Sequence, residues 1–262
     1  MSAADATTTT TTVVVDTTAG SFSLELHGEE APATVARFLA RAGLGPPPEG
    51  STVVPYAGTQ MCESRAHGYL VFGCAAFALE GPPPGAPRGD APQPDEIDAA
   101  AMGLGRRLLD DPKTIEDLWQ RELFPRYSRL REAGKPVPPG LAALVDAIVR
   151  GGTANTALLA GKSRLWYLQA IGYEYAAGRS ARPLERGAIA TANTWPGEAD
   201  ARFLLALAPL PDRDGRATVF GRVASGWDVI DAIQRIPVNK GHRSLTPVLI
   251  TRVRAAEKEP PR

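Results

Sequence analysis

The sequence predicts a mainly β domain that is interrupted by an α-helical block. β-branched residues and alternating apolar residues gather toward both ends of the chain, which is the pattern of half-buried strands. In the centre, apolar residues instead recur at helical spacing. Residues 80–94, EGPPPGAPRGDAPQP, separate the first strands from this centre and have the composition of a linker.

The first elements are a hairpin and a helix. In VVVDTTAGSFSLELHG (13–28), apolar residues alternate with polar ones, and the stretch from Asp16 to Gly20 supplies a turn between two strands. The segment that follows, PATVARFLARAGLG, predicts a helix over 32–43, because Pro32 suits a first helical turn and glycines end the apolar pattern. Short strands are expected around 53–54 and 69–72.

The central block predicts four helices. The second of them has Asp111 as N-cap and Pro112 in its first turn, and Pro125 is expected to kink or split it. The four predicted helices lie within 95–111, 111–134, 141–152 and 157–178.

Strand patterns return at Gly187. Three short β segments are separated by turn residues, and an amphipathic helix and a last strand follow them. In order, these elements are expected at 187–193, 201–209, 217–223, 225–236 and 245–255.

Composition limits the function classes. The 262 residues carry 29 basic and 29 acidic side chains, so the chain has no electrostatic footprint for nucleic acid or for an anionic membrane. No apolar run approaches the roughly 18–20 residues of a bilayer span. Residues 1–12, MSAADATTTTTT, lack the features of a secretory signal and are expected to form a tail, as is 255–262.

The two cysteines and three histidines predict neither a disulfide framework nor a metal site. Cys62 and Cys74 are expected as small buried side chains with free thiols. We therefore expect a soluble protein of the cytoplasm or another reducing compartment, with no metal and no cofactor.

Two stretches of sequence carry ordered motifs. TTAGSFSLELHGEEAPATVARFLA opens the chain, and a later stretch contains Gly187-x-x-x-x-Ala192-Asn193, then Phe220-Gly221-x-Val223 and Gly226-x-Asp228-Val229-Ile230. This series resembles the cyclophilin-type peptidyl-prolyl cis-trans isomerases over 13–74 and 173–254. The resemblance implies an eight-stranded antiparallel β-barrel capped by two helices, with 75–172 as a Pro-rich linker and helical insertion.

The resemblance also implies where a site would lie. In the family, an arginine on the strand after the first helix supplies the key donor to the twisting amide, and a glutamine steadies it. Here Glu63 takes the arginine position when counted from Gly58, and Ser64 takes it when counted back from Tyr69, because the segment has one extra residue. A bulge could place Arg65 in this role.

The substrate-binding residues that the resemblance implies are only partly of the family's type. Phe72 replaces the supporting glutamine, Arg202 a second glutamine and Leu204 a phenylalanine, and Asp212-Arg213 stands where the family has Trp-Leu. Arg202 is a second candidate donor, but we expect it to pair with Glu63 across a closed groove. The implied substrate-binding set is Tyr69, Leu70, Phe72, Ala192, Asn193 and Leu204.

These substitutions predict a cyclophilin-like protein with weak or lost isomerase activity. It would bind a proline-containing peptide or client protein, or serve as a scaffold subunit that docks into an assembly through 75–172. The alternative is an active peptidyl-prolyl isomerase in protein folding, with Arg65 or Arg202 as a relocated catalytic donor. The position of those guanidinium groups distinguishes the two.

Overall fold

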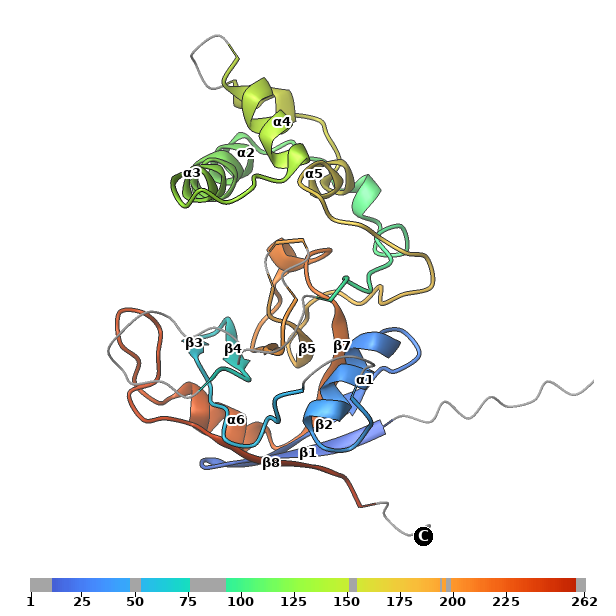
Figure 1. Ribbon diagram of the computed structural model, residues 1–262, viewed down its shortest axis with the longest axis vertical. Coiled ribbons are helices and arrows are strands. Elements are labelled where there is room, and N and C mark those ends of the chain that lie inside the picture. The colour runs from blue at the N-terminus through green and yellow to red at the C-terminus, as the bar shows by residue number, and fades with distance from the viewer. Residues whose placement is uncertain are drawn as a thin grey trace, which may run out of the picture.

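The structure is a computed structural model that describes residues 11–47, 53–75, 93–150, 155–193, 195–196 and 199–257. Eight antiparallel strands form one curled sheet in the order β3-β4-β6-β5-β7-β2-β1-β8 (Figure 1). The strands are β1 (Thr11–Thr17), β2 (Gly20–Leu26), β3 (Glu63–Arg65), β4 (Tyr69–Phe72), β5 (Ala188–Thr191), β6 (Phe203–Ala206), β7 (Val219–Ser225) and β8 (Ile250–Ala255). The predicted eight-stranded antiparallel fold is confirmed.

Three predictions from local pattern need correction or fall outside the described residues. Thr11 and Thr12, expected in the tail, pair with Leu26 and Glu25 and begin β1. Residues 53–55 form no strand. Most of the predicted linker at 80–94 lies outside the described residues.

The two ends of the sheet meet at the segment before β3. Gln60 forms a β-bridge to Cys74, just after β4, and another to Leu249, just before β8. The Met61 amide donates to the Val248 carbonyl at 2.9 Å, which continues this contact. Hydrogen bonding between the ends of the curled sheet leaves less unpaired edge than an open sheet has.

Two helices complete the core inside the curled sheet. They are α1 (Pro32–Arg41) and α6 (Trp227–Gln234), close to the predicted positions. Phe38 of α1 packs against Phe203 and Phe220, with ring centroids 5.6 Å apart in each pair. Gly226 begins α6 with a φ of +87°, and a Cβ there would lie 2.6 Å from the backbone of Phe22, so this position favours glycine.

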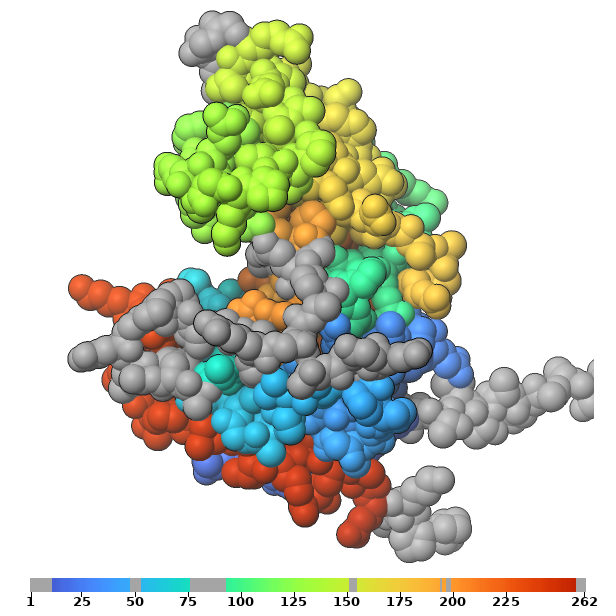
Figure 2. Space-filling model, viewed as in Figure 1, coloured from blue at the N-terminus to red at the C-terminus, as the bar shows by residue number. Residues whose placement is uncertain are grey.

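The helical block forms a second lobe, coloured green and yellow in Figures 1 and 2. Its own apolar core contains Leu123, Leu141, Ile148, Tyr167 and Leu168, all fully buried. The helices are α2 (Pro112–Asp117), α3 (Phe124–Glu132), α4 (Pro139–Ile148) and α5 (Arg164–Ala170). None of the helices that the structure describes is long and apolar enough to cross a membrane.

Some of the local predictions within the helical block are confirmed and one is wrong. The Asp111 carboxylate accepts hydrogen bonds from the Lys113 and Thr114 amides, as predicted for an N-cap. A π-helical stretch at Leu118–Leu123 joins α2 to α3 directly before Pro125, where a residue without an N–H disrupts the helical hydrogen bonds. The helix predicted at 95–111 is wrong: Gly103 takes a left-handed φ of +70°, and only the short 3-10 turn Leu104–Arg106 forms.

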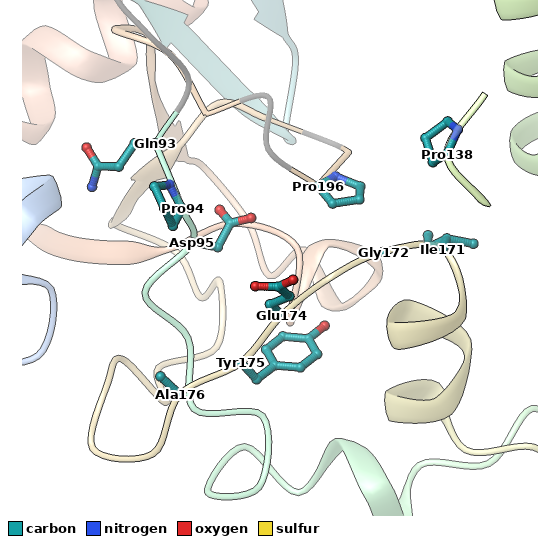
Figure 3. Close-up of a pocket in the computed structure, with 10 residues that line it drawn as sticks. All are labelled: Gln93, Pro94, Asp95, Pro138, Ile171, Gly172, Glu174, Tyr175, Ala176 and Pro196. Carbon is teal, nitrogen blue, oxygen red and sulfur yellow. The ribbon is translucent and has the colours of Figure 1, made fainter. Parts of the chain in front are cut away.

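The segment that leaves the sheet lobe and the segment that returns to it lie side by side. Ile97 and Ser180 form a parallel β-bridge. The Glu96 carboxylate caps α1, because it accepts hydrogen bonds from the Ala33 and Thr34 amides at 3.2 and 2.8 Å. A cavity of about 570 Å³ lies at this junction, between Gln93–Asp95 and the stretch that runs from Ile171 to Ala176 (Figure 3).

Candidate functional site

The outer face of β4, β6 and β5 forms an apolar patch. Val71 of β4 lies opposite Leu204 of β6, and Leu204 lies opposite Ala190 of β5. Tyr69 and Ala192 are half-buried at its edge, and Leu204 itself is fully buried. We call this cluster the outer patch; it consists of Tyr69, Val71, Ala190, Ala192, Leu204 and Ala217, of which Val71, Ala190, Leu204 and Ala217 are buried.

Two of the predicted substrate-binding residues face the other way. Leu70 and Phe72 have no exposed surface and belong to the core inside the curled sheet, where Phe72 stacks on Phe203 with centroids 5.4 Å apart. Successive side chains of a strand point to opposite faces. The structure therefore brings Tyr69, Ala192 and Leu204 together but leaves Leu70 and Phe72 on the inner face.

The strand register resolves the ambiguity over the arginine position. Glu63 pairs with Val71 and lies on the outer face, whereas Ser64 pairs with Leu70 and is buried. The extra residue is taken up in the turn at 66–68, where His67 adopts a left-handed φ of +57°. Of the two residues that the sequence left open, Glu63 is the one on the outer face.

Arg65 is held by its neighbours on this face. It pairs with Tyr69 in a regular register, without the bulge that the sequence suggested. Its Nε donates to Glu63 Oε1 at 2.7 Å, and its Nη1 lies 2.8 Å from His242 Nε2. The bond to Glu63 raises the pKa of the Arg65 guanidinium, and the same Glu63 oxygen accepts from the Tyr69 hydroxyl at 3.0 Å.

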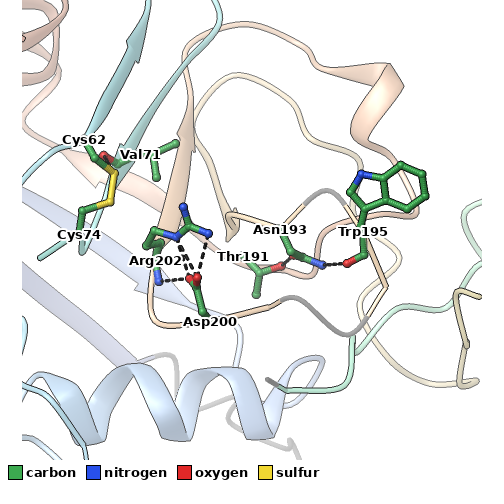
Figure 4. Close-up of polar contacts among 8 residues, drawn as sticks. All are labelled: Cys62, Val71, Cys74, Thr191, Asn193, Trp195, Asp200 and Arg202. Atoms are coloured by element: carbon green, nitrogen blue, oxygen red, sulfur yellow. Dashed lines mark hydrogen bonds and ion pairs between the residues drawn. A yellow bond between two sulfur atoms is a disulfide. The ribbon is translucent and has the colours of Figure 1, made fainter. Parts of the chain in front are cut away.

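Arg202 pairs with Asp200 and not with Glu63, so the predicted cross-groove ion pair is wrong (Figure 4). The Asp200 carboxylate accepts from Arg202 Nε at 2.9 Å and from its backbone amide at the same distance. A partner two residues away in sequence requires no long-range placement. Arg202 therefore pairs with Asp200, the carboxylate closer to it in sequence.

Asn193 is buried in a network of its own. Its Nδ2 donates to Asp95 Oδ1 and to the Arg216 carbonyl, both at 3.1 Å. Its Oδ1 accepts from the Thr191 hydroxyl at 2.6 Å (Figure 4). Burial raises the pKa of Asp95 to about 7. The amide that the resemblance assigned to a peptide is thus 2% exposed and bonded within the protein.

Cys62 and Cys74 form a disulfide, which corrects the expectation of two free thiols (Figure 4). Their Cα atoms lie 5.9 Å apart. The two residues flank the β3-β4 hairpin, and antiparallel pairing brings them together: the Cys62 amide donates to the Val71 carbonyl at 2.9 Å. Their positions just outside the two ends of one hairpin were the available signal.

Arg213 is the residue that sequence reasoning missed. It lies on the turn Pro211–Arg213, and its guanidinium carbon is 4.5 Å from the centre of the Tyr69 ring. Its Nη2 donates to the Tyr69 hydroxyl at 3.1 Å. The sequence marked this position only as a lost Trp-Leu pair, but the structure places a cation over the outer patch.

The loop that carries Arg213, residues 211–216, is held by hydrogen bonds and an ion pair from the helical block. Arg164 of α5 donates to the carbonyls of Asp212 and Asp214. Arg216 is buried, forms an ion pair with Glu122 at 2.6 Å, and has its guanidinium over the Tyr167 ring. The block therefore fixes the loop that borders the outer patch.

The comparisons with known proteins agree with this architecture. The family model for cyclophilin type peptidyl-prolyl cis-trans isomerase/CLD matches residues 144–255. Over these residues the chain is similar to the cyclophilin family. A peptidyl-prolyl cis-trans isomerase-like 1 of Neurospora crassa is 37% identical over 73 residues, which are 28% of this chain and 45% of that protein.

Other relatives extend the likeness. Peptidyl-prolyl cis-trans isomerase CYP18-2 of Arabidopsis thaliana is 28% identical over 112 residues, 43% of this chain and 66% of that protein. The chain thus spans about half the length of several curated relatives it matches. A cyclophilin type isomerase structure from Cryptosporidium parvum aligns with a TM-score of 0.53 at 13% identity, over 95% of this chain and 99% of that one, and shares its fold.

Proposed function

We propose that this cyclophilin-like chain has weak or no prolyl isomerase activity and serves to bind a proline-containing peptide or as a scaffold subunit. The observation that carries the proposal is the state of the outer patch. Turning an X-Pro bond crosses a barrier of roughly 18–20 kcal/mol, and a donor must hold the amide as it twists. Counted from Gly58, Glu63 takes the donor position that the resemblance implies, and Arg65 Nε pairs with Glu63 Oε1 at 2.7 Å.

The apolar surface for a proline ring is also altered. Leu204 has no exposed surface, so a proline would pack against Tyr69, and the Arg213 guanidinium already covers the Tyr69 ring. Asn193 is bonded to Asp95 and to a backbone carbonyl, so it has little capacity left for a peptide. A peptide that binds here would first have to move Arg213.

We further propose that the helical block, expected at 75–172, is the part that docks into an assembly. Its surface carries an apolar groove of about 480 Å³ between α4 and α5, where Leu158 and Trp166 are 44% and 38% exposed. Because the block contacts the 211–216 loop, docking of the block to a partner would affect the position of the loop beside the outer patch.

A prolyl isomerisation assay on a proline peptide tests the proposal. We expect no rate above the uncatalysed background for the wild type. We expect measurable acceleration from the double variant Glu63→Arg/Arg213→Leu, which restores a donor and uncovers Tyr69, and none from the matched control Glu63→Gln/Arg213→Leu.

The alternative function is an active isomerase with a relocated arginine, and the cation over Tyr69 is the observation that favours it. Wild-type acceleration that Arg65→Ala, Arg202→Ala or Arg213→Ala abolishes would establish that alternative and remove the scaffold proposal as a complete account.

A further inference from the structure

A second cavity lies between the helical block and the 211–216 loop. Its volume is about 510 Å³, within the range of roughly 300–1,000 Å³ that small ligands and side chains occupy. Charged residues dominate its wall. The arginines are Arg121, Arg129, Arg164, Arg213 and Arg216, and the acidic residues are Asp117, Glu122 and Asp212.

The cavity has an excess of positive charge after its ion pairs are formed. Arg216 pairs with Glu122 at 2.6 Å, and Arg121 pairs with Asp117 at 3.1 Å. Asp212 is then the acidic residue that remains on the wall, against three arginines: Arg129, Arg164 and Arg213.

Two of these arginines donate to neutral groups. Arg164 donates to the carbonyls of Asp212 and Asp214, and Arg129 donates to the carbonyl of Pro125 at 3.1 Å. A backbone carbonyl satisfies a hydrogen bond but does not cancel the positive charge. The Asp212, Asp214 and Glu122 carboxylates offset part of the charge of Arg164. An excess of guanidinium groups over carboxylates on the wall of a partly enclosed cavity favours a carboxylate or phosphate ligand.

Arg213 links this cavity to the outer patch. It lines the cavity, and its guanidinium also lies 4.5 Å from the centre of the Tyr69 ring. Arg213 therefore contacts both the cavity and the Tyr69 side of the outer patch. The cavity of Figure 3 has the opposite character, because Asp95 and Glu174 are the charged residues on its wall.

We propose that the arginine-lined cavity binds an acidic side chain of a proline-containing peptide whose proline segment lies on the outer patch. The proposal rests on the peptide binding proposed above and names the class of peptide. On binding, Arg213 leaves the Tyr69 ring and turns to the carboxylate. The ligand thereby uncovers the patch that its own proline contacts.

Fluorescence anisotropy with the full chain tests this. The parent probe is a fluorescein-labelled nine-residue peptide with a central proline among alanines, and each further probe has one alanine replaced by glutamate. We expect at least one glutamate position to lower Kd about tenfold, equivalent to about 1.4 kcal/mol. Arg129→Gln should remove most of this gain, whereas the control Arg131→Gln, on the same helix but outside the cavity wall, should keep it.

Each other outcome is decisive. If the parent probe binds and no glutamate tightens it, the inference is overturned while peptide binding stands. If no probe binds, peptide binding fails, and the inference fails with it. Equal tightening when the proline is replaced by alanine would overturn the link to the outer patch. Equal losses in Arg129→Gln and Arg131→Gln would overturn the cavity as the site.

Discussion

The two faces of β4 and β6 follow the cyclophilin pattern to different degrees. On the inner face, Leu70, Phe72 and Phe203 are fully or almost fully buried in a cluster of stacked and tilted rings. On the outer face, Glu63 accepts a hydrogen bond from Arg65 beside Tyr69, and the Arg213 guanidinium covers the Tyr69 ring. Packing accepts any apolar residue of suitable volume, whereas catalysis requires particular atoms at particular points. A core can therefore tolerate substitutions that a catalytic surface would not.

Removing a ring from the inner face should have the largest effect. Phe203 contacts the rings of Phe38, Tyr56 and Phe72, so Phe203→Ala should lower the free energy of unfolding by about 3–5 kcal/mol, measured by urea denaturation. The neighbouring Arg202→Ala breaks a partly exposed ion pair and should cost less than about 1 kcal/mol. Equal losses would contradict the contrast between the faces.

Breaking the ion pair between the lobes should come next. Arg216→Met leaves Glu122 without its partner in a largely buried site and should cost roughly 3 kcal/mol in urea unfolding. The double variant Glu122→Met/Arg216→Met should recover part of the loss. Arg121→Met, in the exposed pair with Asp117, should change stability by about 0.5 kcal/mol or less. A comparable loss there would show that burial does not govern these pairs.

The disulfide beside the outer patch should contribute slightly less. It closes a short loop with a sequence separation of 12, for which chain entropy predicts about 2–3 kcal/mol. The variant Cys62→Ser/Cys74→Ser should lose this amount under oxidising conditions. The wild type with reductant serves as the control and should lose a similar amount. Detection of two free thiols in the unreduced wild type would refute the pairing.

The smallest effect concerns Asp95 at the junction and depends on pH. Its pKa is about 7 in the folded protein, against an ordinary value of 3.8. Between these values the unfolded chain releases the proton while the folded chain retains it, so stability falls as pH rises from about 4 to 7. Asp95→Asn should therefore stabilise the protein at pH 8 and have little effect near pH 4, as thermal melts at the two pH values would show. A destabilised variant at pH 8 would contradict the assignment.

Much of the fold followed from local pattern. The alternation in 13–28 predicted the β1-β2 hairpin, and the apolar spacing after Pro32 and after Gly226 predicted α1 and α6. The helix expected at 95–111 does not form. The glycine at 103 and the hydrogen bonds to the rest of the chain outweigh the weak helical preference of this segment.

The site was less predictable. Sequence identified Tyr69, Ala192 and Leu204, which do meet, but it also grouped with them Leu70 and Phe72 from the opposite face. One extra residue left two registers open for the arginine position. Only strand pairing decided that Glu63 faces outward and Ser64 inward.

The sequence by itself determined the neutral charge, the two strand-rich ends, the helical centre and the family resemblance, because each depends on composition or on near neighbours. The tertiary structure alone decided which distant groups meet. Glu96 caps a helix that begins more than sixty residues earlier, and Arg213 reaches Tyr69 across 144 positions. Such contacts depend on the path of the whole chain, and no local periodicity encodes that path.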